Sequence, residues 1–598
     1  MVTRAHSPFG PARFDGAAQL RGYGAAMRTL LLIALAAFCA AATGAPKAVA
    51  TFHSIGLYWS PEGGGEGNAA RVQFREAKGS WRPGLDLWFD GRNNEYRGSI
   101  VELKPDTEYE VRLTLGGKTE TIKARTWSER FPVKRTVQVK PGTTHLVIEA
   151  TESGDEDGYV VFTGGTIDQK DVAGEDFLKD NCVVIRQGTH HVIVRGLKLQ
   201  NCKRSGVFIE RQGQPVIDAQ THDIVIEGNE IAGWGAYDNS KPERQQPQND
   251  AAVQCSYFRE TDDRKRPDRI IVQNNTMRDP RHAATPWQRT GAPRKHPEGP
   301  QGVLFVKCGT NHVIRYNDIY SKNGKWFMDG IGGAENFSAQ GFPFADSDIY
   351  GNKISQVYDD GIEAEGANRN VRIWRNYFNE VFVAIGNAAT ATGPLYVWRN
   401  VSDRMSNVYH PDGDPDAELR GPFIKAGSNH ATYNGGRAYY FHNTILQPPG
   451  KRFGGGAGWG IYNSGGKLTN FVSRNNVWHI HKEVIIHGQP KFYAISANEQ
   501  GADADFDLHN GSLNRAGSSA ERRGWMSRPV YASSGKEYPD LGGQPGNFQL
   551  RKGSPGYGSA EPIANFNDGF GARPDVGAHQ SGQPPMRFGR EAAAGDSP

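Results

Sequence analysis

The chain of 598 residues is short of cysteine and of net charge, and each shortage excludes a class of protein. It has 5 Cys and no Cys-x-x-Cys pair, so the spacing of a common zinc site is missing. A net charge of +4 is small for this length, which argues against a nucleic-acid-binding protein. After residue 50, no segment is apolar enough to cross a bilayer as a helix. A chain this long is expected to form more than one folded unit.

The N-terminal region predicts the compartment. Arg28 precedes the apolar run 30–38, which small residues follow up to Ala48-Val49-Ala50. A charged end, a short apolar core and an Ala-x-Ala cleavage site are typical of a secretory signal. We therefore expect a secreted or periplasmic protein whose signal starts near Met27 and ends near residue 50. Residues 1–26 are either an upstream extension or an unusually long charged region.

The chain has a repeated phrase: β-branched residues, one residue, an Asn, one residue and an apolar residue. Residues 224–231 are one copy, Ile-Val-Ile-Glu-Gly-Asn-Glu-Ile. The repeated Asn residues are Asn229, Asn275, Asn317, Asn352, Asn376, Asn400, Asn443 and Asn476. Two consecutive intervals of 24 residues, from 352 to 376 and on to 400, indicate the basic unit, and longer intervals contain inserted loops. Such self-similarity is typical of a repeat architecture.

Each unit contains short strands that Gly, Asn and Asp separate, and none can close a core alone. Stacked coils would pair each strand with those above and below, and the stacked Asn side chains could bond to one another. On this repeat, residues 131–535 resemble the right-handed parallel β-helix of the pectate-lyase-like superfamily. That superfamily includes lyases, hydrolases, epimerases, esterases and adhesins. A propeller or sandwich is the alternative, with a longer and more even period.

The flanking regions differ from the repeat. Residues 51–130 alternate apolar and polar residues and contain the phrase 103–113, Leu-Lys-Pro-Asp-Thr-Glu-Tyr-Glu-Val-Arg-Leu. This phrase resembles the tyrosine corner of a fibronectin type III domain, a small immunoglobulin-like β-sandwich that serves as a spacer or docking module. Residues 536–582 resemble the closing segment of secreted β-helix proteins, so we expect a cap there. Residues 583–598 are rich in Gly, Pro and charge and are expected to be disordered.

Two cysteines are spaced by nearly one coil. Cys182 and Cys202 are 20 residues apart and would meet on neighbouring coils. A secreted protein permits a disulfide there. Small buried side chains within the stack are the equal alternative.

Acidic residues recur just before one strand of the repeat. Coils in such a stack are about 4.8 Å apart, so side chains at equivalent positions lie close together. The expected line contains Ser205, Asp250, Gln301, Asp329 and Asp360, with Asp359, Glu363 and Glu365 beside it.

Carboxylates this close repel one another unless a cation, a basic side chain or a proton neutralises them. Ca²⁺ accepts several carboxylates in flexible geometry, so it is the expected cofactor. The expected ligands are Asp250, Asp329, Asp359, Asp360, Glu363 and Glu365. Two other interpretations stay open: a catalytic acid pair of a hydrolase, and ordinary turn residues that bind nothing.

Lysines and arginines near these strands complete the candidate site. Related β-helix lyases use Lys or Arg as the base and Ca²⁺ to neutralise the substrate carboxylate. If Gly421 aligns with the other strand glycines, Lys425 falls in the column of Glu365, and Lys307 is a second candidate. Arg369, Arg372 and Arg437 would clamp an anionic sugar or pair with the acids. The loop 278–300, with Trp287, His282 and His296, would form a groove wall.

The family signatures for a more specific assignment are absent. The phrases of pectate lyases proper and the Gly-His-Gly and Arg-Ile-Lys phrases of galacturonases do not occur. Residues 409–416, Tyr-His-Pro-Asp-Gly-Asp-Pro-Asp, loosely resemble a phrase of β-helix mannuronan epimerases, but their order differs.

We therefore predict a monomeric polysaccharide lyase that cleaves a uronate-containing polymer by β-elimination. Lys425, Lys307, Asp360 and Glu363 are the candidate catalytic residues, and Arg369, Arg372, Arg437 and Trp287 would bind the substrate. A glycoside hydrolase that uses paired carboxylates and a non-catalytic polysaccharide-binding protein are the alternatives. Loop shapes set sugar specificity, so the sequence leaves the sugar open.

Overall fold

The computed structural model describes residues 44–594 except for several internal gaps. These gaps are 211–218, 237, 239–249, 258–259, 288–295, 336–337, 406–420, 428–434, 447–459, 464–469, 481–484, 487–488, 491–492, 497–501, 515–520 and 534–545. Residues 45–598 form one compact unit, to which the description below applies. The predicted signal up to residue 43 and the phrase 409–416 lie outside the described residues, whereas the predicted end of the signal, at residues 48–50, falls within the first strand of the sandwich, Lys47–Ala50. No helix among the described residues is long and apolar enough to cross a membrane.

Residues 47–125 form a sandwich of two antiparallel sheets. The first sheet has the order β1 (Lys47–Ala50), β2 (Ile55–Trp59), β6 (Glu95–Ile100) and β5 (Trp88–Asp90). The second has the order β4 (Arg82–Pro83), β3 (Arg71–Glu76), β7 (Glu108–Leu115) and β8 (Lys118–Arg125). Alternate residues of β7, such as Tyr109, Val111 and Leu113, point into the shared core. The predicted fibronectin type III identity of this sandwich stays a prediction.

The rest of the unit is a parallel β-helix with three faces, and the all-β, parallel β-helix prediction is confirmed. We call the face that holds the acidic strands the site face. Its strands are β10 (Leu146–Ile148), β13 (Val183–Ile185), β16 (Val207–Glu210), β19 (Ala251–Ser256), β22 (Gln301–Val306), β25 (Ile331–Gly332), the second halves of β27 (Lys353–Glu363) and β29 (Tyr377–Asn387), β32 (Ile424–Ala426), β35 (Ile461–Asn463), β40 (Tyr493–Ser496) and β43 (Ser512–Asn514).

The second face is a single 12-stranded sheet, here called the docking face. Its strands are β9 (Val133–Gln138), β11 (Tyr159–Thr163), β14 (His190–Arg195), β17 (His222–Glu227), β20 (Asp268–Gln273), β23 (Val313–Arg315), β26 (Asp348–Tyr350), β28 (Val371–Trp374), β30 (Leu395–Trp398), β33 (Ala438–Phe441), β36 (Phe471–Arg474) and β41 (Ala502–Asp505).

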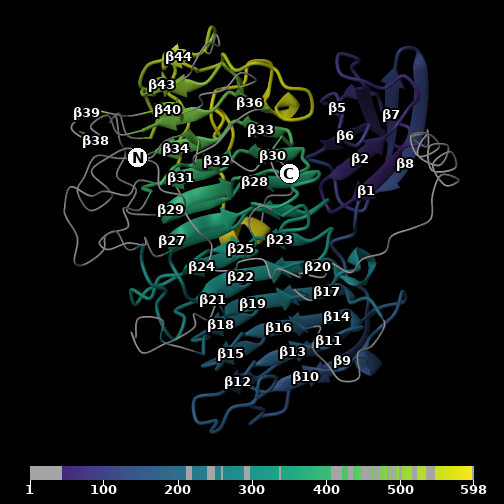
Figure 1. Ribbon diagram of the computed structural model, residues 1–598, viewed down its shortest axis with the longest axis vertical. Coiled ribbons are helices and arrows are strands. Elements are labelled where there is room, and N and C mark those ends of the chain that lie inside the picture. The colour runs from purple at the N-terminus through teal and green to yellow at the C-terminus, as the bar shows by residue number, and fades with distance from the viewer. Residues whose placement is uncertain are drawn as a thin grey trace, which may run out of the picture. The chain divides into compact units, whose positions relative to one another are not determined.

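The third face, here called the covered face, shares β27 and β29 with the site face. Its other strands are β12 (Thr166–Asp168), β15 (Lys198–Gln200), β18 (Glu230–Ala232), β21 (Thr276–Arg278), β24 (Asp318–Tyr320), β31 (Val401–Asp403), β34 (Thr444–Leu446), β37 (Val477–His479), β42 (Leu508–His509) and β44 (Trp525–Met526). A small hairpin, β38 (Ile485–Ile486) and β39 (Gln489–Pro490), and four 3₁₀ turns, η1 (Ala150–Glu152), η2 (Asp263–Lys265), η5 (Asp568–Phe570) and η6 (Gly589–Ala594), complete the described elements. Figure 1 shows the coils following one another along the stack.

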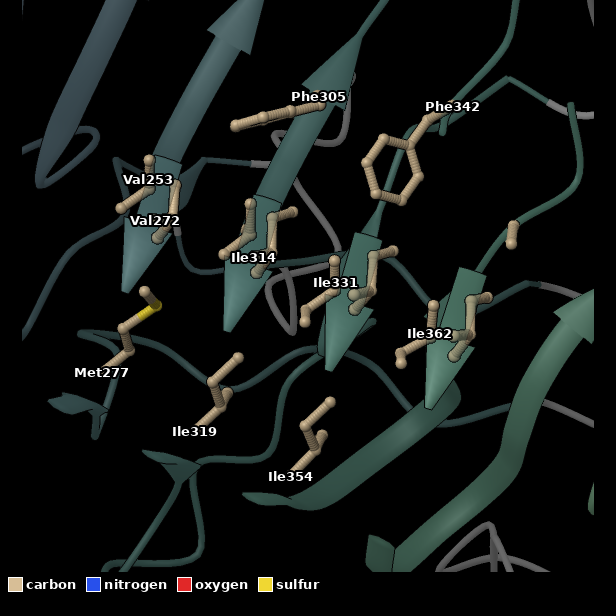
Figure 2. Packing of buried hydrophobic residues seen from close by; sticks show 14 of the residues in the cluster. Val253, Val272, Met277, Phe305, Ile314, Ile319, Ile331, Phe342, Ile354 and Ile362 are labelled. Carbon is tan, nitrogen blue, oxygen red and sulfur yellow. The ribbon is translucent and has the colours of Figure 1, made fainter. Parts of the chain in front are cut away.

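Equivalent apolar residues of successive coils stack inside the helix. On the site face, Val253 pairs with Val303, which pairs with Ile331, and Ile331 pairs with Ile362. Figure 2 shows Val253, Ile331 and Ile362 of this row beside the row of Met277, Ile319 and Ile354 from the covered face. Complete burial of one such side chain contributes about 1.5–3 kcal/mol. The repeated β-branched residues of the sequence therefore form the core of the stack.

The repeated Asn residues form a buried ladder between the docking face and the covered face. Asn352 donates from its backbone N–H and its Nδ2 to Oδ1 of Asn376, over 3.1 and 3.0 Å. Asn376 repeats both bonds to Asn400. The same pair of bonds runs from Asn229 to Asn476 and ends on Asp507. The predicted bonding between stacked Asn side chains is confirmed.

Two disulfides join neighbouring coils in the N-terminal half of the β-helix. Cys182 bonds to Cys202, the pairing that the sequence left open. Cys255 bonds to Cys308, which the spacing did not indicate because an insert lengthens the coil between them.

The C-terminal segment, yellow in Figure 1, lies along the side of the coils. Phe548, Leu550 and Val576 pack on Val401 and Val477, which point outward from the covered face. The expected cap therefore covers this face, because its outward apolar residues need shielding. The predicted disorder of residues 583–598 was wrong for 583–594, since Met586 and Phe588 are buried in the same cluster.

The sandwich contacts the docking face through buried polar groups. Tyr58 donates to Oδ2 of Asp346 over 2.7 Å. Arg372 forms a buried ion pair with Asp348 and donates to Ser99 of the sandwich over 3.2 Å. The sandwich is therefore fixed on the helix.

Candidate functional site

The strands β25, β27, β29 and β32 place acidic and basic groups side by side on the site face. Glu363 pairs in register with Gly386, and Gly386 pairs with Lys425, so these three residues form a column over three coils. A side chain at Gly386 would clash with Asp360 and would lie 3.0 Å from Oε1 of Glu365. At Gly332, a Cβ would lie 3.0 Å from Oε2 of Glu363. Two glycines thus leave room for the carboxylates.

Five carboxylates gather here, and all are at least nine-tenths buried: Asp329, Asp359, Asp360, Glu363 and Glu365. We call this set the acid cluster. Asp329 accepts a hydrogen bond from the backbone N–H of Asp360 over 3.0 Å. Glu363 accepts one from the N–H of Ala334 over 3.1 Å. Other buried oxygens have no hydrogen-bond partner among the described residues, namely Oδ2 of Asp329, Oδ1 of Asp360 and Oε1 of the adjacent Gln301.

Two cationic side chains contact the acid cluster. Nζ of Lys425 lies 2.6 Å from Oδ2 of Asp360 and 2.9 Å from Oε1 of Glu365. Nε2 of His296 lies 2.7 Å from Oδ2 of Asp359. The ring of Trp287 packs edge-on against His296, with centroids 4.7 Å apart. The loop 278–300 thus brings Trp287 and His296 beside the acids, as the sequence suggested for a groove wall.

Burial and mutual repulsion change the pKa values of these groups. Burial, followed by the neighbouring carboxylates, raises the pKa of Asp329 well above its usual range. Burial also raises the pKa of Glu365 to about 7, although Lys425 opposes the rise. The pKa of Asp359 is lowered, because His296 and Lys425 outweigh burial. Asp359 raises the pKa of His296 to about 9 against the effect of burial. The acids thus compete for too few positive charges.

A divalent cation would offset this imbalance of charge, but among the described residues no three side chains of the acid cluster offer ligand atoms that all lie within 4.8 Å of one another, and the group that meets this spacing is His191, His222 and Asp223. The cluster has five carboxylates, and within the part of the chain that the structure describes two cationic side chains, Lys425 and His296, contact it. Its unpartnered oxygens are hard ligands of the type that Ca²⁺ prefers. The space kept by Gly332 and Gly386 lies against three of the carboxylates.

Register corrects three details of the predicted column. Ala251, and not Asp250, pairs with Gln301, so Asp250 is one residue off the line. Its carboxylate pairs with Arg204 over 2.9 Å instead. Ile424 pairs with Ile385, which puts Gly421 two residues away from the glycine position. Lys425 therefore shares the column of Glu363, and it reaches Glu365 through its side chain.

The other basic residues lie outside the acid cluster. Lys307 pairs with Glu335 over 3.2 Å at the end of β22. Arg372 is fully buried against the sandwich and cannot clamp a sugar, which corrects its predicted role. Arg369 lies over Tyr58 of the sandwich, with its guanidinium 5.7 Å from the ring centroid. Arg437 lines a different cavity, described below. Arg369, Arg372 and Arg437 lie in or next to the docking-face strands β28 and β33, which their positions in the sequence did not reveal.

Sequence reasoning missed the glycines that make room and the contact of His296 with Asp359. Gly386 lies inside an apolar strand, where glycine is otherwise unfavourable, and this was an available signal. His296 comes from the loop before β22, two coils before the strand β27 that carries Asp359, so no local pattern joins it to Asp359.

Comparisons with known proteins give only distant likenesses. No protein-family model and no curated protein matches the chain. A crystal structure of pectate lyase Pel9A is 12% identical, with a TM-score of 0.33, and the match covers 75% of this chain and 86% of that one. Pectate lyase Pel3 from Pectobacterium carotovorum is 7% identical, with a TM-score of 0.15, over 65% of this chain and 93% of that one. The fold assignment therefore rests on the strand register above.

Proposed function

We propose that this protein is a polysaccharide lyase that cleaves an acidic, uronate-containing polymer by β-elimination. One observation carries the proposal: the amine of Lys425 is held beside a buried cluster that has more carboxylates than cations. Lys425 is also 21% exposed, so its amine can reach a ligand on the site face.

Elimination needs a base next to a substrate whose carboxylate charge is offset. In the neutral form, the Lys425 amine takes the proton from the ring carbon next to the uronate carboxylate. The electron pair of that C–H bond forms the ring double bond, and the glycosidic oxygen leaves with the electrons of its bond to carbon. Burial lowers the pKa of Lys425, but Asp360, Glu365 and Asp359 raise it to a net value well above normal. The base therefore needs those acids neutralised.

Ca²⁺ held by Asp329, Asp359, Asp360, Glu363 and Glu365 would offset that charge and the charge of the substrate carboxylate. The protein's own groups do the rest. Lys425 moves the proton, the glycines keep the carboxylates close, and the Trp287–His296 pair borders the acids on one side.

A glycoside hydrolase is the second candidate, because adjacent acids here have pKa values pushed in opposite directions. The pKa of Asp360 is raised, mainly by burial, and that of Asp359 is lowered. Such a pair can act as acid and base. Lys425 would then only position Asp360.

The test is incubation with a panel of uronate polymers, with Ca²⁺ or with chelator, while ultraviolet absorbance of unsaturated ends and reducing sugar are followed together. A lyase gives both signals, only with Ca²⁺. Lys425→Ala should lower the rate by at least about a hundredfold, and Lys307→Ala is the matched control. Reducing sugar without absorbance would favour the hydrolase. If no polymer gives either signal, the lyase and the hydrolase assignments are both contradicted.

A further inference from the structure

A second cavity lies between the sandwich and the docking face, and no member of the acid cluster lines it. Its volume is about 880 Å³, which is within the range of small-ligand sites. The sandwich contributes β5 and the loops beside it, and the helix contributes Arg437, Tyr439 and Asn470. The cavity is thus large enough for several sugar rings.

Aromatic side chains form much of the cavity wall. Trp88 and Phe89 of β5 are half-buried, so part of each ring faces the cavity. Arg97 lies over Trp88, with its guanidinium 5.3 Å from the ring centroid, and Phe89 packs on Tyr96 at 4.9 Å. Rings held in this way offer fixed apolar faces, against which the C–H faces of sugar rings can pack.

Arg437 brings a cation without a protein counter-charge. Its Nε is buried without a hydrogen-bond partner, and none of the described acidic side chains forms an ion pair with it. Its guanidinium lies 5.7 Å from the ring centroid of Tyr439. Asp86 lines the same cavity without pairing with Arg437. A half-buried, unpaired guanidinium among aromatic rings suits a carboxylate, which it can bind through two parallel hydrogen bonds.

The neighbouring arginines differ, because they hold the two walls together. Arg92 bonds to Asp90 over 2.8 Å and donates to the carbonyl of Ala391 over 2.9 Å. Arg97 donates to the carbonyl of Gly393 over 2.9 Å. The cavity is therefore preformed. The residues 391–393 follow β29 directly, and Gly386 of β29 borders the acid cluster.

We propose that this cavity is a second binding site for the acidic polysaccharide, in which Arg437 pairs with a uronate carboxylate and Trp88 and Phe89 pack against the sugar rings. The choice of a uronate rests on the proposed function. The site would hold the polymer on the same coils that carry the acid cluster, without taking part in the elimination.

The experiment is isothermal titration calorimetry with a galacturonate hexasaccharide on the full chain carrying Lys425→Ala, which removes turnover. Arg437→Ala and Trp88→Ala should each weaken binding about tenfold or more, and Arg437→Lys should weaken it less. Trp81→Ala is the matched control, since Trp81 lies on the other side of the sandwich under Arg75 and Arg112. Thermal unfolding of each variant checks that it is folded.

A neutral hexasaccharide and an acidic glutamate peptide complete the test. The proposal expects neither to bind at the concentrations that saturate the uronate. Equal affinity for the neutral sugar or the peptide would overturn it, as would unchanged uronate binding in folded Arg437→Ala and Trp88→Ala variants. If the protein binds uronate through Arg437 and Trp88 and yet cleaves no polymer, that result would support this binding site and contradict the proposed lyase activity.

Discussion

The Asn ladder and the acid cluster lie on the same coils but differ in how their buried polar groups are hydrogen-bonded. In the Asn ladder, every coil from Asn229 to Asn476 repeats one residue, and each side chain donates to the Asn of the next coil, whose Oδ1 accepts. On the site face, equivalent positions differ from coil to coil, and buried oxygens of Asp329 and Asp360 have no partner. Repetition satisfies the ladder internally, whereas some buried oxygens of the acid cluster have no hydrogen-bond partner among the described residues. The ladder is therefore a stabilising element, and the cluster is a candidate binding site.

The largest expected effect comes from breaking the ladder. Asn376→Ala removes the acceptor of the Asn352 N–H, one acceptor of the Asn352 Nδ2, and the side-chain donor that bonds to Oδ1 of Asn400. We expect the free energy of unfolding to fall by about 3–5 kcal/mol, since several buried polar groups lose partners. Thermal and denaturant unfolding measure this, with Asn93→Ala in an exposed turn as the control. A fall no larger than in the control would contradict the role of the ladder.

The next effect comes from filling the space in the acid cluster. Gly386→Ala adds a Cβ against the carboxylate of Asp360, so we expect Ca²⁺ affinity and turnover to fall about ten- to a hundredfold. Calorimetry and initial rates measure the two quantities. Gly569→Ala is the control, because a Cβ there would meet no atom within 4 Å. Unchanged affinity in Gly386→Ala would show that the cation does not use this space.

A third test compares the cluster with a buried acid that has built-in basic neighbours. Burial raises the pKa of Asp346 to about 6, while Arg372, Tyr58 and Arg369 oppose the rise. The folded protein keeps this proton between pH 4 and 6, where the unfolded chain has lost it. Asp346 therefore favours folding at low pH by up to about 3 kcal/mol, and this contribution is lost as pH rises from about 4 through 6.

Asp346→Asn should flatten this part of the pH profile, which unfolding at several pH values between 4 and 7 measures. The wild type supplies the reference slope. An identical slope in the variant would mean that Asp346 ionises normally.

The smallest effect has the opposite sign to that of the ladder. Asp329→Asn keeps an Oδ1 acceptor for the N–H of Asp360. It removes a carboxyl group whose pKa is raised by burial and by neighbouring carboxylates, so it removes one negative charge from the cluster at a pH above that raised pKa. In the presence of chelator, we expect unfolding to become about 1 kcal/mol less favourable, because repulsion falls. With Ca²⁺ present, the gain should disappear. A loss of stability in chelator would indicate a structural role like that of the Asn residues.

The ladder and the core could be predicted from the sequence because each coil repeats them. The acid cluster was predicted in composition but not in register. Coil lengths vary, so a shift of one residue at Asp250 or two at Gly421 leaves no trace in the local pattern. The strand β27 also runs across a corner, with a register shift between Val357 and Asp360.

Contacts between distant segments were not predictable. Arg372 lies in a strand that reads like the others, and only the docked sandwich turns it into a buried group. His296 reaches Asp359 from an inserted loop. The C-terminal segment covers a face whose outward residues, such as Val401 and Val477, look like core residues in the sequence.

The most direct test of the central claim is calorimetric titration of the chelator-treated protein with Ca²⁺, alongside Asp360→Asn and Asn376→Ala. The account predicts saturable Ca²⁺ binding by the wild type and by any folded Asn376→Ala, and its loss in Asp360→Asn. No binding by the wild type, or equal binding by Asp360→Asn, would contradict it.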